Sequence, residues 1–69
     1  MNGPMLNPVR IWRRRQRLER EALEEAQFFR RRYGESALDA AREQQLRPEV
    51  TTWGYRVLDR AIQLLKSRV

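Results

Sequence analysis

Residues 8–34 read PVRIWRRRQRLEREALEEAQFFRRRYG, and this stretch decides the fold. Asn7 before it is a favourable N-cap residue, and Pro8 suits the first helical position, where its missing N–H group costs nothing. Gly34 provides a stop signal, because glycine readily takes the left-handed conformation that ends many helices. We therefore predict one long helix over residues 8–33.

The apolar residues of this helix predict which face packs against the rest of the chain. At 100° per residue, six of them fall within one arc, which only Arg15 interrupts. They are Ile11, Leu18, Ala22, Ala26, Phe29 and Tyr33. At about 1.5 Å per residue the helix would be roughly 39 Å long, which is more than two short helices can cover. Its N-terminal half is therefore expected to project or to pair with a partner.

Two shorter helices are expected after the long one. The second, over residues 36–46, has a narrow alanine-rich face that permits close approach to a neighbour. The third is expected over residues 48–67, because Pro48 suits a first helical turn and disfavours helical geometry in the residue before it. The predicted fold is all-α, with three helices, the two shorter ones packed on the C-terminal half of the first.

The sequence also predicts the limits of this arrangement. Residues 1–7 are expected to form a flexible N-terminal tail, followed by a single helical domain over residues 8–69. A chain of 69 residues lies at the size where one hydrophobic core is marginal.

The third helix has an apolar arc wider than one neighbouring helix normally covers. Trp53 lies in the middle of its main stripe and is expected in the core. Tyr55, Leu58 and Ile62 widen the arc to about half of the circumference. We interpret this surplus as a self-association surface, which makes a homo-oligomer the expected state.

The composition argues against an enzyme. The chain has no cysteine and no histidine, which excludes thiol chemistry and removes the usual general base and metal ligand. It also lacks a glycine-rich phosphate loop and a nucleophile elbow. Glu21, Glu24 and Glu25 could ligate a metal, but such glutamates more often pair with arginines one helical turn away. We expect no catalytic residues, no cofactor and no bound metal.

The expected location is the cytoplasm. No apolar run approaches the roughly 20 residues that span a bilayer. Residues 1–9 lack the basic and apolar segments of a secretory signal.

Positive charge is concentrated at the start of the long helix. The chain has 15 basic and 9 acidic residues, a net charge of +6, and Lys66 is its only lysine. Residues 1–20 contain six arginines against one glutamate. A preference for arginine fits bidentate recognition of phosphate or carboxylate groups. Codon bias in a GC-rich genome remains the alternative explanation.

The arginine cluster is the candidate binding site, because it lies at the helix end whose macrodipole is already positive. Each charge in the first turn is unfavourable there by about 0.3–1 kcal/mol, which an anionic partner would offset. A solvated, salt-screened face is the alternative that needs no partner. The candidate residues are Arg10, Arg13, Arg14, Arg17 and Arg20, with Trp12 beside them.

Three kinds of partner are compatible with this cluster. An acidic protein is preferred, because the glutamates from Glu19 to Glu25 dilute the basic face where a longer nucleic-acid-binding stripe would continue. The alternative is nucleic acid, with the arginines on the phosphate backbone and Trp12 stacked on a base. A third alternative is a membrane surface, which Trp12 would enter together with Met5, Leu6, Val9 and Ile11.

Part of the chain resembles a known group of proteins. The residues concerned are 25–37 (EAQFFRRRYGESA), Ala40-Ala41-Arg42, Trp53, Val57, Ala61-Ile62 and Leu64-Leu65. This pattern resembles a group of small uncharacterised alphaproteobacterial helical proteins over residues 22–65. It departs from them at Arg47-Pro48, where a Gly-Asp turn would be usual. The resemblance implies a helical fold and no activity, and the arginine cluster lies outside it.

Overall fold

The computed structural model describes residues 8–67, and every regular element in that range is helical. Helix α1 spans Pro8–Tyr33, a 3₁₀ turn η1 spans Gly34–Ser36, α2 spans Ala37–Gln45 and α3 spans Thr52–Lys66. No strand occurs within the described range, so the predicted all-α fold is confirmed.

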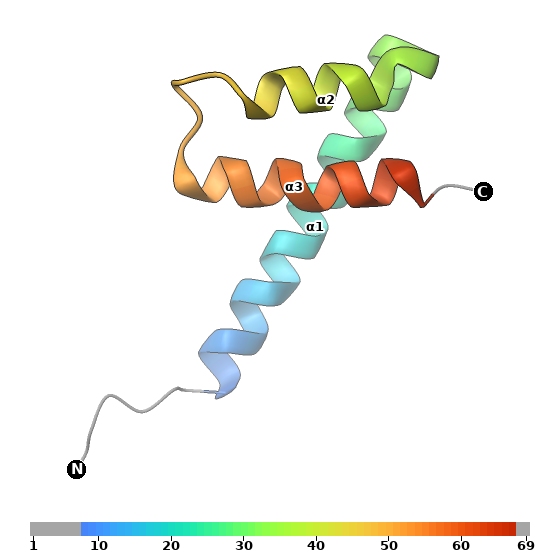
Figure 1. Ribbon diagram of the computed structural model, residues 1–69. Coiled ribbons are helices and arrows are strands. Elements are labelled where there is room, and N and C mark those ends of the chain that lie inside the picture. Colours follow the sequence, from blue (N-terminus) through green and yellow to red (C-terminus); the bar gives the residue numbers. More distant parts are fainter. Residues whose placement is uncertain (1–7, 68–69) are drawn as a thin grey trace.

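The two shorter helices pack on the C-terminal half of α1, as predicted. Figure 1 shows α2 and α3 side by side, with α1 crossing behind α3 and its N-terminal half extending away from both. Helices α1 and α2 follow each other through η1 without a coil residue. The chain from residue 8 to residue 45 can therefore also be traced as one bent helical segment against which α3 packs.

The bend lies at Gly34, as the sequence predicts. Gly34 has a φ of +56°, in the left-handed region, and it directly follows the last residue of α1. A Cβ atom added there would meet nothing within 4 Å. The position therefore favours glycine because of its backbone conformation and not because of crowding.

The predicted start of the third helix at Pro48 is wrong. Helix α3 begins at Thr52, and its N-cap is Thr51, whose Oγ1 accepts a hydrogen bond of 2.9 Å from the backbone N–H of Gly54. Pro48 lies instead in a turn in which the N–H of Val50 donates to the carbonyl of Arg47. Threonine gives the stronger start because its hydroxyl pairs an N–H group that the helix itself leaves unpaired. The predicted tail and the Asn7 cap lie outside the described residues.

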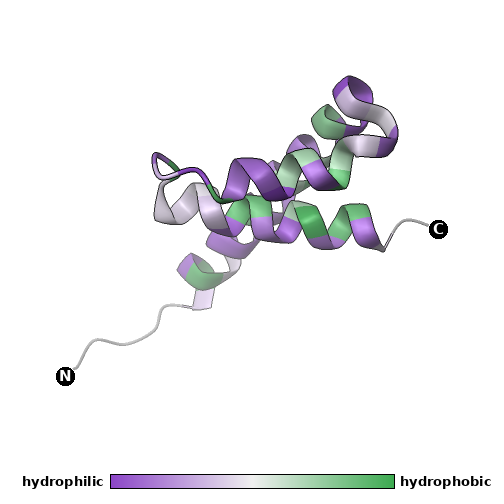
Figure 2. Ribbon diagram, turned by 45° about the horizontal axis from the view of Figure 1, so that its top comes forward, coloured by the Kyte–Doolittle hydropathy of each residue, from purple (hydrophilic) through white to green (hydrophobic). Residues whose placement is uncertain are grey.

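Alanines make the closest contacts between the helices. Among the described residues only Ala22, Ala26, Ala41 and Ala61 are completely buried. Three of these join Val57 in the contact between α1 and α3, while Ala41 belongs to a second cluster. The members of that second cluster are Phe29, Ala37, Ala41, Leu58 and Ile62. Figure 2 shows that hydrophobic residues recur along α3, most densely in its C-terminal half.

The expected self-association surface on α3 is not exposed as a unit. Leu58 and Ile62 are each only 7% exposed, whereas Tyr55 is 50% exposed. The expectation that all three lie on the outside is wrong, because α3 packs against both α1 and α2 and two neighbours cover the wide arc. Self-association itself stays a prediction, and it needs a different surface.

Only the middle of the apolar stripe on α1 is buried. Its middle residues Ala22, Ala26 and Phe29 are buried, whereas Ile11 and Tyr33 at its two ends are 45% and 42% exposed. The stripe continues past the edge of α3 on both sides. All residues from Pro8 to Arg17 are exposed, and we call this segment the arm.

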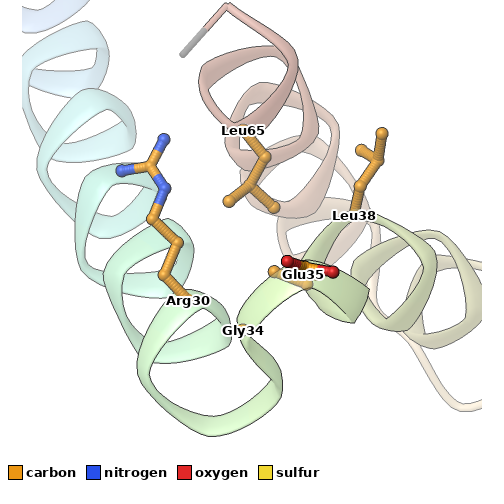
Figure 3. Close-up of a pocket in the computed structure, with 6 residues that line it drawn as sticks. Arg30, Gly34, Glu35, Leu38 and Leu65 are labelled. Carbon is orange, nitrogen blue, oxygen red and sulfur yellow. The ribbon is translucent and has the colours of Figure 1, made fainter. Parts of the chain in front are cut away.

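Arg30 joins α1 to the end of α3. Its guanidinium group donates a hydrogen bond of 3.1 Å to the carbonyl oxygen of Leu64, one of the last carbonyls of that helix. A cation at a helix C-terminus is favoured by the macrodipole as well as by the hydrogen bond. Figure 3 shows Arg30 beside Leu65 at a cleft of about 460 Å³ that Glu35 and Leu38 also line. We interpret Arg30 as structural.

Two adjacent phenylalanines provide a matched test of the core. Phe29 is 4% exposed and Phe28 is 44% exposed. Phe29→Ala should cost about 3–5 kcal/mol. A domain of this size has a total stability of only about 3–10 kcal/mol, so most of it should be lost. Phe28→Ala should cost much less in the same urea titration, and equal losses would contradict the assigned packing.

Candidate interaction surface

Four of the five predicted arginines line one groove. Arg10, Arg13, Arg14 and Arg17 follow the i, i+3, i+4, i+7 spacing that places residues on one helix face. Together with Trp53 of α3 they line an open groove of about 310 Å³. All four arginines are exposed and Trp53 is half-buried. The groove is therefore a positively charged surface with an indole at one end.

A three-residue contact holds Trp53 at this position. The indole N–H of Trp53 donates to one carboxylate oxygen of Glu21 at 2.8 Å, and Nε of Arg17 donates to the other oxygen at 2.8 Å. The guanidinium carbon of Arg17 also lies 5.3 Å from the centre of the Trp53 ring, within cation–π range. Glu21 thus orients both the arginine and the tryptophan.

The same contact changes the acidity of Glu21. The hydrogen bond from Arg17, and after it the hydrogen bond from Trp53, lower the pKa of this carboxyl below its ordinary value of 4.5. Both donors stabilise the ionised form, which is the direction expected for a hydrogen-bonded carboxylate. Glu21 therefore carries its negative charge at neutral pH and partly neutralises Arg17.

Glu19 is also paired within the chain. One of its carboxylate oxygens lies 2.9 Å from Nε of Arg60 on α3. The side chains are 37% exposed for Arg60 and 46% for Glu19, so this pair adds little stability. It does remove Glu19 from competition for the arginines of the arm.

The remaining two predicted site residues lie elsewhere. Trp12 is 60% exposed and lines a separate groove of about 370 Å³ with Pro8, Ile11 and Arg15. At 100° per residue it lies about 200° around the helix from Arg10. Trp12 therefore lies beside Arg15 but on a different face of α1 from the groove that Arg10, Arg13, Arg14 and Arg17 line. Arg20 is exposed but does not line the arginine groove.

Sequence reasoning missed Trp53 as a site residue. It placed Trp53 in the core, since the residue falls on the apolar stripe of its helix. The structure packs it at the edge of the α1–α3 contact, half-buried, with its N–H group on Glu21. Tryptophan often occupies such edges, because its polar N–H group needs a partner. The sequence offers no signal for this pairing, since Glu21 and Trp53 are 32 residues apart.

A second groove beside the first is acidic. It has a volume of about 300 Å³, and Glu21, Glu25 and Glu49 are among the residues that line it. Trp53 belongs to both grooves, so the two are neighbours. Within residues 8–67 no three histidine, cysteine or acidic side chains are placed to hold a metal ion.

The pH dependence of stability tests the Glu21 contact. The folded state lowers the pKa of Glu21, so the contact stabilises the fold above pH 4.5 and is lost as the pH falls through the lower folded-state value. Glu21→Gln should therefore lose less thermal stability than the wild type between neutral pH and about pH 3. Circular dichroism melts measure the difference, and Glu43→Gln, on the exposed side of α2, controls for the loss of one carboxylate. An unchanged pH dependence in Glu21→Gln would contradict the contact.

Comparisons with known proteins add no information about this surface. No protein-family model, no curated protein and no solved structure matches the chain. Within the described residues, no helix is both long enough and apolar enough to cross a membrane. The function must therefore be argued from the geometry of the chain itself.

Proposed function

We propose that this chain is a small non-enzymatic interaction module that binds an acidic protein surface through its arm. The observation that carries the proposal is the row formed by Arg10, Arg13, Arg14 and Arg17 along one face of an exposed helical segment. The first turn of α1 contains no acidic residue, and the side chains of all four arginines are exposed. The arm presents guanidinium groups to whatever approaches it.

Electrostatics favours an anionic partner for this row. The positive end of the α1 macrodipole adds to the charge of the arginines, which makes their crowding unfavourable in the free chain. Carboxylates offset both terms, and arginine binds them through two parallel hydrogen bonds. Arg17 already binds a carboxylate within the chain, through one hydrogen bond of 2.8 Å from its Nε to Glu21.

The length of the row favours a protein over a nucleic acid. Arg10 and Arg17 are about 10 Å apart along the helix axis, at 1.5 Å per residue. Beyond Arg17, the groove face continues with Glu21 and Glu25, so the basic surface ends there. Duplex phosphates continue along their strand and would meet this negative charge. A short row of carboxylates on a protein would not.

Nucleic acid is the second candidate. It is favoured because two glutamates near the arm are already paired within the chain, which reduces their repulsion of phosphates. Glu19 is bound to Arg60, and Glu21 is bound to Arg17 and Trp53, so both are partly neutralised within the chain. Trp53 is half-buried beside the arginines, and an aromatic ring at such a position can stack on a base. Four phosphate contacts would give a log–log salt dependence with a slope of about −4 on duplex DNA.

Paired arginine variants test the proposed partner class. Arg13→Gln with Arg14→Gln should weaken binding of a poly-glutamate peptide about 5- to 30-fold, since each exposed ion pair contributes about 0.5–1 kcal/mol. Arg31→Gln with Arg32→Gln removes the same charge from the other end of α1 and should have little effect. Trp53 fluorescence in a Trp12→Phe background reports binding, because Trp53 is then the only tryptophan and lies in the groove.

The same titration separates the two candidates. Stronger binding of poly-glutamate than of duplex DNA at about 0.15 M salt supports the protein partner. Duplex DNA binding with a slope near −4, lost in the Arg13/Arg14 variant, supports nucleic acid instead. Equal effects of the Arg13/Arg14 and Arg31/Arg32 pairs on both probes would overturn the proposed site.

A further inference from the structure

The charge of α1 reverses along one face. The face that carries Arg10, Arg14 and Arg17 continues at helical spacing with Glu21 and Glu25. Phe28 follows on the same face and is 44% exposed, although it is a large apolar residue. One half of the face is therefore basic and lies on the arm. The other half is acidic, lies beside α3 and ends in an exposed aromatic ring.

The acidic half borders a second groove, between α1 and the start of α3. The groove of about 300 Å³ combines Glu21, Glu25 and Glu49 with apolar side chains that include Val50 and Val57. It joins the arginine groove at Trp53, which lines both. Carboxylates around a partly apolar groove match the chemistry of the arm, whose arginines have long apolar stems.

We infer that the arm of one copy docks on the acidic half of α1 in a second copy, and the reverse, in a two-fold dimer. This inference rests on the proposed function and names a second copy of this chain as the acidic partner. The two α1 helices run antiparallel. The contact is then self-complementary, as a two-fold interface requires.

An antiparallel register places the basic half of each α1 opposite the acidic half of the other. If Arg17 of one copy lies level with Glu21 of the other, then Arg14 lies level with Glu24 and Arg13 with Glu25, because each step along one helix is matched by a step back along the other. Arg13 and Glu24 border the face on the same side. The two-fold axis makes each of these pairs occur twice.

The same register places Arg10 of one copy against Phe28 of the other. The guanidinium group of Arg10 would then lie over the ring of Phe28, in a cation–π contact. This contact would also cover the exposed side chain of Phe28. A parallel arrangement would instead place arginine against arginine. The net charge of +6 on each copy opposes association at long range, but salt screens that repulsion more than it weakens pairs in contact.

Charge exchange between two variants tests this dimer. Variant one carries Arg13→Glu and Arg14→Glu, and variant two carries Glu24→Arg and Glu25→Arg. Each variant alone should sediment as a monomer, because like charges then meet across the interface. An equimolar mixture should form a dimer, since both contacts are again between opposite charges. Restoration in the mixture also shows that both variants are folded.

A matched control and one contrary result complete the experiment. Arg31→Glu with Arg32→Glu changes the net charge as much as variant one does, at the opposite end of α1, and should stay dimeric. Sedimentation of the wild type as a monomer at about 1 mM protein and about 0.1 M salt would overturn the inference. So would a mixture of the two variants that remains monomeric.

Failure of this inference is distinguishable from failure of the proposed function. A monomeric wild type that still binds poly-glutamate through Arg13 and Arg14 would overturn only the second copy as the partner. A wild type that neither dimerises nor binds poly-glutamate would overturn both. If both hold, added poly-glutamate should dissociate the dimer, because it competes for the same arginines.

Discussion

The close crossing of α1 and α3 through alanines is the constraint on which the rest of the structure depends. Ala22 and Ala26 of α1 meet Ala61 of α3, and all three are completely buried. Small side chains let two helix backbones approach closely, so the contact excludes water without large core residues. Every larger side chain of the core, Phe29 included, keeps some exposure and packs around this crossing. The position of the crossing on α1 therefore decides what else is covered.

Because the crossing lies in the C-terminal half of α1, the chain leaves its most charged segment outside. The arm from Pro8 to Arg17 is exposed throughout, and α3 ends its coverage with Trp53 in the first turn. The indole of Trp53 therefore lies between the arm and the packed part of α3, hydrogen-bonded to Glu21 and covered by Arg17. A packing contact between apolar faces has in this way placed an aromatic ring at the end of a row of arginines.

The crossing also separates two charge environments on one helix. On the arm, arginines meet the positive end of the helix dipole, which is an unfavourable arrangement without an anionic partner. Where α1 packs against α3, Glu19 pairs with Arg60 and Glu21 accepts a hydrogen bond from Trp53. At the far end, Arg30 meets the C-terminal carbonyls of α3, which the dipole favours. Unfavourable electrostatics is thus concentrated on the exposed arm, and this concentration is the physical reason why we propose that the arm binds a partner.

The sequence by itself determined the features whose signals are local. Helix α1 ends at Tyr33 because Gly34 after it takes the left-handed conformation, and four arginines share a face because helical spacing requires it. The start of α3 was predicted at the wrong residue. Both Pro48 and Thr51 are local signals for a helix start, and the helix begins after Thr51, whose hydroxyl caps it. Only the tertiary structure decided that Leu58 and Ile62 are covered, because a second helix packs on their side of α3. Likewise, only packing brought Trp53 to the arginines, since the crossing point of two helices depends on which side chains fit together and not on the spacing along either one.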